Sequence, residues 1–272
     1  MYSQTCGNMQ SHVEGVPILG LQVGFNAKAA LASMDLTKAG FPGPKRVFNG
    51  EHGYFKLIEN DDYDISYLQE NIGKLWMVNQ LAHKPFPSGR LTHGLVHAIK
   101  DLKLKHGLNK DDIESIECFV PPGVYKLVAR PIIDNLTTNY SKLCAKFVGA
   151  SFMINDHLNI ETFTEKKYLN NKDTLNFAKK ITMIKNDKLD QKVLTPQKFI
   201  ITLVNNSKIE INIDHVYGHP KAPLSEKEYL EKFSKCCFSS TNKVDQNQVN
   251  RMLDFIFDLE NKDNVIDFFK TI

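Results

Sequence analysis

Apolar side chains recur at helical spacing near the start of the chain. Residues 3–13 fit a short helix, and residues 26–39 fit a longer one. Glu14–Pro17 indicates a break between them. The run Gly40–Pro44 ends the second helix, because glycine takes the left-handed turn and proline cannot continue a helix. The pattern therefore predicts a helical first segment that ends near Asp64.

The middle of the chain mixes extended and helical patterns. Residues 111–128 are rich in β-branched and aromatic side chains, which favours an extended segment, and residues 136–154 return to helical spacing. The clearest strand pattern is 199–213, where two alternating runs flank the turn sequence Asn205–Lys208. This arrangement predicts an antiparallel hairpin.

Helical signals return in the last third. Ser225 is a typical N-cap, with Glu228 placed three residues later as its capping-box partner. Two closing helices complete the pattern. With helices at both ends and a mixed centre, the sequence predicts the α+β class.

Composition narrows the classes of protein. The chain has 272 residues, 42% hydrophobic and 24% charged, and no apolar run approaches the roughly 20 residues that cross a bilayer. The start lacks a secretory signal, and five cysteines without a C-x-x-C pair argue against disulfides and zinc. A net charge of +3 with scattered lysines argues against nucleic acid. We expect a cytoplasmic protein that binds neither membrane nor nucleic acid.

Four groups of motifs are informative through their order and spacing. The second, Lys84–His93, has prolines and a glycine that preset a bend before a predicted helix. The others are Ser3–Gly7 with Gln22–Ala27, Ala39–Pro44 and Asn49–Tyr54; Ile113–Ile116 leading to Arg130–Pro131; and Tyr217–Ser225. Together they resemble the MmgE/PrpD family of 2-methylcitrate dehydratase and cis-aconitate decarboxylase, over nearly the whole chain.

The resemblance implies a division of the chain. Residues 1–80 would be part of a helical domain, residues 81–220 an inserted α+β domain, and residues 221–272 the helices that return to the helical domain. The family's preceding half, whose aspartate-rich motif and histidine contribute to the cleft, has no counterpart in these 272 residues. We therefore expect an active site that is incomplete on its own.

Lys84, Arg90 and His93 form the best local group of chemical residues, at the start of a predicted helix. Family members move a proton next to a carboxylate of small polycarboxylates without a metal. The resemblance thus implies His93 and Lys84 as catalytic residues and Arg90 as a substrate ligand, with no cofactor and no metal. In the alternative, Thr92 caps the helix, His93 satisfies a buried backbone group and the two cations are solvated.

Other positions are less direct. Tyr125 corresponds, within a shift of two residues, to an active-site tyrosine of the family, or else is half-buried packing on a strand. His219, between glycine and proline, is interpreted as structural. The dehydratases and decarboxylases carry ionisable groups where this chain has Leu19, Gln22 and Gly89. These differences point to other chemistry or to lost catalysis.

Two functional hypotheses follow. The first is a lyase or isomerase acting on a small di- or tricarboxylic acid, once an N-terminal half is supplied. The second is a non-catalytic relative that serves as an interaction module. As partners we expect a homodimer or a complementing N-terminal chain, because the helices of 3–39 and 249–259 would expose apolar surface without one.

Overall fold

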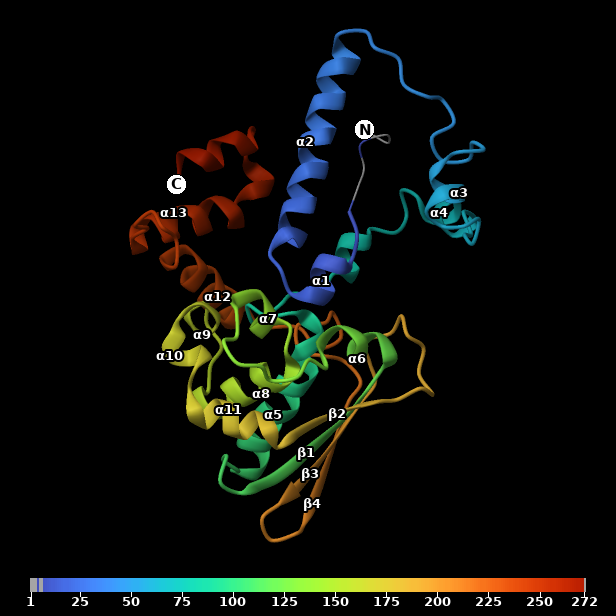
Figure 1. The fold of residues 1–272 in the computed structure, drawn as a ribbon. Helices are drawn as coiled ribbons and strands as arrows, with labels where there is room; N and C mark the ends of the chain where they lie inside the picture. Colours follow the sequence, from blue (N-terminus) through green and yellow to red (C-terminus); the bar gives the residue numbers. More distant parts are fainter. Residues whose placement is uncertain (1–3, 5–6, 272) are drawn as a thin grey trace.

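The chain combines a small sheet with helices. The computed structural model describes residue 4 and residues 7–271, without the side chain of residue 19. Figure 1 shows the sheet and its helices in the lower part and α2 and α13 in the upper part, with both ends of the chain there. The predicted α+β class is confirmed.

Two helices open the described chain, α1 (Gln10–Glu14) and α2 (Ile18–Lys38). The break predicted between them is confirmed: Gly15 ends α1 in the left-handed region, with φ at +73°, and Pro17 precedes α2. The helix predicted for 26–39 therefore starts earlier. The helix predicted for 3–13 falls partly on residues 3, 5 and 6, which lie outside the described residues.

The chain between α2 and the sheet-bearing part forms short helices. They are α3 (Tyr54–Leu57), α4 (Ser66–Asn71) and the 3-10 helices η2 (Met77–Gln80) and η3 (Arg90–Thr92). Many large apolar side chains of residues 9–81 are exposed, among them Val23, Leu31 and Trp76. This segment therefore buries little apolar surface against the rest of the described chain.

Four strands form one mixed sheet, in the order β2-β1-β3-β4. β1 (Ile113–Val120) pairs in parallel with β2 (Ile181–Lys185) and antiparallel with β3 (Gln197–Leu203), and β3 pairs antiparallel with β4 (Lys208–Ile213). The predicted hairpin is confirmed, with Asn206 at a positive φ of 66° in its turn. The parallel strand β2 had no clear signal in the sequence.

Helices cover one face of this sheet (Figure 1). α5 (His93–His106) contacts β3 and β4, while α8 (Ala145–Asn155) and α11 (Lys172–Lys179) contact β2 and each other. The remaining helices of this region are α7 (Thr138–Lys142), α9 (Glu161–Thr164) and α10 (Lys166–Leu169). Phe147, Phe163 and Phe199 are fully buried between these layers. The main core thus lies within 95–216, and the domain boundaries predicted at 80 and 220 stay predictions.

The extended segment predicted for 111–128 is half wrong. After β1, residues Pro122–Val128 form the helix α6, with Pro122 at its first turn. Proline suits that position, because it has no N–H to leave unpaired and its φ is already helical. The prolines that seemed to interrupt a strand instead end it and begin a helix.

The closing helices are α12 (Glu226–Phe238) and α13 (Gln246–Phe257), followed by η4 (Leu259–Asn261) and η5 (Val265–Lys270). The predicted capping box at Ser225 and Glu228 is confirmed, and Asp245 with Gln248 forms another at α13. Val249 and Met252 are buried on α13, whereas Phe257 and Phe269 stay exposed.

Arg130 ties α1 to the sheet-bearing part. Its side chain is 8% exposed, and its Nη2 donates to the carbonyl of His12 on α1. The guanidinium lies 5.1 Å from the ring centre of Tyr140. This contact fixes one end of the helical segment against the sheet-bearing part.

Candidate functional site

The chain before α5 folds into a tight bend held by hydrogen bonds. The N–H of Gly89 donates to the carbonyl of Lys142 (2.8 Å), and the Thr92 N–H and hydroxyl both donate to the carbonyl of Gly89 (2.9 and 2.7 Å). Thr92 is the residue before α5, but its side chain accepts no bond from the helix. The capping role considered for Thr92 is wrong, because its hydroxyl closes the preceding bend.

His93 is fully buried at the first position of α5. Its Nε2 lies 3.0 Å from the hydroxyl oxygen of Ser88, and the ring of Phe86 meets it edge-on at 5.4 Å between centres. Burial, followed by the charges of Lys84 and Arg90, lowers the pKa of His93 to about 3. His93 is therefore neutral near pH 7 and faces the protein interior, while its proposed role in proton transfer stays a prediction.

Three cations from different elements surround this buried imidazole. Lys84 precedes the bend, Arg90 lies in η3 and Lys232 lies on α12, and the charge of each lowers the pKa of His93. Lys84 and Lys232 form no ion pair within the described residues. The structure thus brings Lys84 and Arg90 to one buried group, as the sequence predicted, and adds Lys232, which had no signal beyond its helix.

A cavity of about 770 Å³ lies between the 84–87 segment, the chain after α8, and α12. Lys84 and Lys232 line it together with apolar side chains that include Phe86, Phe152 and Leu224. Its Glu228 is already engaged by Lys100, at 3.7 Å. The cavity therefore offers unpaired positive charge above an apolar wall, which suits a small organic anion.

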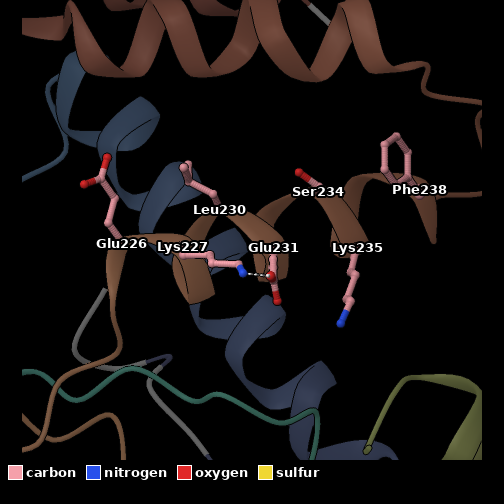
Figure 2. Close-up of a pocket in the computed structure, with 7 residues that line it drawn as sticks. All are labelled: Glu226, Lys227, Leu230, Glu231, Ser234, Lys235 and Phe238. Atoms are coloured by element: carbon pink, nitrogen blue, oxygen red, sulfur yellow. Dashed lines mark ion pairs between the residues drawn. The ribbon is translucent and has the colours of Figure 1, made fainter.

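A second hollow runs along the outer side of α12 (Figure 2). It measures about 640 Å³, and Figure 2 shows Leu230 and Phe238 as its apolar members, with Lys227 and Glu231 paired at 4.0 Å. All its lining residues belong to this one helix or its last residue. It has no opposing element to close around a ligand, so the cavity at Lys84 is the better candidate.

Several sequence candidates lie elsewhere. Tyr125 is on the helix α6 and not on a strand, is 37% exposed, and does not line the cavity. Gln22 holds α1 to α2 through bonds with Asn8 (3.2 Å) and Ser11 (3.3 Å). At Gly89 an added Cβ would lie 2.7 Å from Leu143, so a larger side chain has no room there. The roles predicted for Tyr125 and Arg90 stay predictions.

Within residue 4 and residues 7–271, no helix combines the length and apolar character needed to cross a bilayer. In the same residues, no group of three or more histidine, cysteine or acidic side chains is arranged to hold a metal ion.

These features define an α+β protein with a cationic cavity beside the start of a buried helix. Residues 86–255 match the model of the MmgE/PrpD C-terminal domain. This match covers more than half of the chain, and the chain belongs to the MmgE/PrpD family.

Two curated relatives are similar over most of this chain. Cis-aconitate decarboxylase of Mus musculus is 24% identical over 229 residues, and that of Homo sapiens is 24% identical over 222 residues. Each match covers 78% of this chain and 44% of the relative. The chain therefore spans less than half the length of the curated relatives it matches.

Proposed function

We propose that this chain carries the substrate-clamping part of an MmgE/PrpD-type lyase or isomerase that acts on a small di- or tricarboxylic acid. The observation that carries the proposal is the convergence of Lys84, Arg90 and Lys232 around the first residue of α5. Their segments lie within or next to the region that matches the family model. Cations without acidic partners are the groups that hold carboxylates.

In this proposal Lys84 meets the substrate, because it lines the cavity. Removing a proton beside a carboxylate builds negative charge on the carboxylate oxygens, and fixed cations stabilise that charge in the transition state. His93 acts behind this site as a positioning residue, because its imidazole is buried and hydrogen-bonded to Ser88. A complementing segment, from the same or another chain, supplies the remaining groups.

A second candidate is a non-catalytic interaction module. The exposed apolar side chains on α2, such as Val23 and Leu31, favour it, because such surface usually contacts a partner. The two candidates differ in turnover and agree in association.

The test is an assay of dehydration, decarboxylation and epimerisation with citrate, cis-aconitate and aminodicarboxylates. The chain is assayed alone and co-expressed with the part of the mouse relative that the match leaves uncovered. Turnover that requires Lys84 supports the lyase or isomerase. A folded complex without turnover on any of these acids contradicts it and supports the interaction module.

A further inference from the structure

Arg90 carries a charge that the described protein leaves without a partner. Its side chain is half-buried, and its Nη1 is buried without a hydrogen-bond partner in the described residues. No ion pair to Arg90 occurs among those residues either. A buried guanidinium without an acceptor is unfavourable, so this geometry points to an anion that enters the site.

His219 is held in one tautomer. The backbone N–H of Lys221 donates to its Nδ1 at 3.0 Å, which requires a lone pair on that nitrogen. The neutral ring therefore carries its proton on Nε2. Burial and then the charges of His215, Arg90 and Lys221 lower the pKa of His219, so the ring stays neutral near pH 7. His219 is thus a fixed hydrogen-bond donor within the electrostatic range of Arg90.

The ring of His219 is also fixed in position. It stacks on His215, with 4.7 Å between ring centres and 10° between planes. The turn that carries it is closed by Gly218 N–H to the Ala222 carbonyl and Ala222 N–H to the His219 carbonyl, both at 2.7 Å. The ring therefore presents its Nε2 without much loss of freedom on binding.

The turn is anchored to the segment that leads to Arg90. The N–H of His83 donates to the carbonyl of Gly218 at 2.8 Å. Gly218 has a φ of +88°, and a Cβ there would lie 1.9 Å from the carbonyl oxygen of His83. Only glycine allows this approach, which brings the two motif segments Lys84–His93 and Tyr217–Ser225 side by side.

We propose that Arg90 and His219 together bind one carboxylate of the substrate, apart from the cavity that Lys84 lines. The guanidinium donates to one oxygen and the Nε2–H of His219 to the other, while His215 supports the ring. This carboxylate site deepens the proposed function and rests on it for the choice of a di- or tricarboxylic acid. It also gives the conspicuous G-H-P turn a binding role in addition to the structural one.

Two substitutions at His219 separate binding from folding. His219→Asn places an amide oxygen near the position of Nδ1, so it keeps an acceptor for Lys221 and removes the Nε2 donor. His219→Gln places an amide NH₂ near the position of Nε2, so it keeps the donor and loses the acceptor. Arg90→Lys keeps the charge and loses the two-pronged donor geometry.

The experiment measures binding of tricarballylate, an unreactive tricarboxylate, to the full 272-residue chain. Calorimetry gives the affinity, and ¹⁵N spectra of the histidine rings report the tautomer. We expect a neutral His219 with its proton on Nε2 at pH 7, and a change of its signal on binding. H219N and R90K should each weaken binding by about 10-fold or more, since hydrogen bonds to charged groups are lost, and H219Q should weaken it less.

Each other outcome overturns a defined part of the account. If H219N and R90K bind like the wild type and only Lys84→Met loses affinity, the inference is wrong and the proposed function stands. If the wild type binds no tricarballylate, both are wrong. Equal affinity for inorganic phosphate, lost in R90K, would show a general anion site and overturn the carboxylate assignment. A proton on Nδ1, or a charged His219 ring at pH 7, would remove the donor on which the inference depends.

Discussion

The Nε2 of His93 lies 3.0 Å from the hydroxyl oxygen of Ser88, and both side chains are buried. Ser88 in turn lies 3.0 Å from the hydroxyl of Thr92, which donates to the carbonyl of Gly89. The imidazole therefore belongs to a closed network that shapes the bend before α5. It supports the cations around it without facing the cavity that Lys84 lines.

This burial predicts a loss of stability in acid. The pKa of His93 falls from 6.5 to about 3 on folding, so between these values the unfolded chain binds a proton that the folded chain does not. The free energy of unfolding should therefore fall with decreasing pH, by about 1.4 kcal/mol per unit below pH 6.5 from this residue. His97, whose pKa burial also lowers, acts in the same direction.

His93→Gln tests this contribution. Urea unfolding at pH 7 and pH 5 should show a stability difference about 2 kcal/mol smaller in H93Q than in the wild type. The exposed His106, at the other end of α5, provides the control H106Q, which should keep the wild-type difference. An identical pH dependence in all three proteins would mean that His93 is not buried as a neutral group.

The close approach at Gly218 predicts an uneven response to alanine. Gly107 and Gly218 both have positive φ, at 65° and 88°, but only Gly218 has atoms in the way of a Cβ. Gly107→Ala should cost about 1–2 kcal/mol through left-handed strain alone. Gly218→Ala should cost about 1–3 kcal/mol more, because the carbonyl of His83 has to move. Equal losses in urea unfolding would contradict the contact between these two segments.

The exposed apolar side chains of α2 predict self-association. Val23 is 70% exposed and Leu31 is 62% exposed. Sedimentation velocity should show species larger than a monomer, and Val23→Gln with Leu31→Gln should shift the chain toward the monomer. Leu104→Gln changes an equally exposed leucine, 73% exposed, on α5 and should leave association unchanged. A monodisperse wild-type monomer, or the same effect from L104Q, would sink this prediction.

Local signals in the sequence predicted the elements that depend on neighbouring residues. The capping box of Ser225 and Glu228 and the hairpin turn at Asn206 follow from side-chain and backbone preferences within a few residues. The break at Gly15 follows from glycine and proline in the same way. Each of these was predicted at or near its observed position.

Long-range contacts were beyond the pattern. The parallel strand β2 depends on pairing with β1, more than sixty residues earlier, and Tyr125 lies on a helix because two prolines end β1. Lys232 meets the site only because α12 returns to α5, and the stacking of His215 on His219 needs a folded turn. The sequence therefore predicted Lys84, Arg90 and His93 as a group, but neither the burial of His93 nor the partners from distant segments.

Deuterium exchange tests the central claim most directly. The chain, supplied with the part of the relative that the match leaves uncovered, is incubated in D₂O with citrate, cis-aconitate or an aminodicarboxylate, and exchange beside a carboxylate is followed by NMR. We expect exchange by the wild type, a loss of at least about 100-fold in Lys84→Met, as for other removed charge-stabilising groups, and unchanged exchange in the exposed control Lys208→Met. Exchange that never exceeds the protein-free rate, or that Lys84→Met leaves intact, would contradict the account.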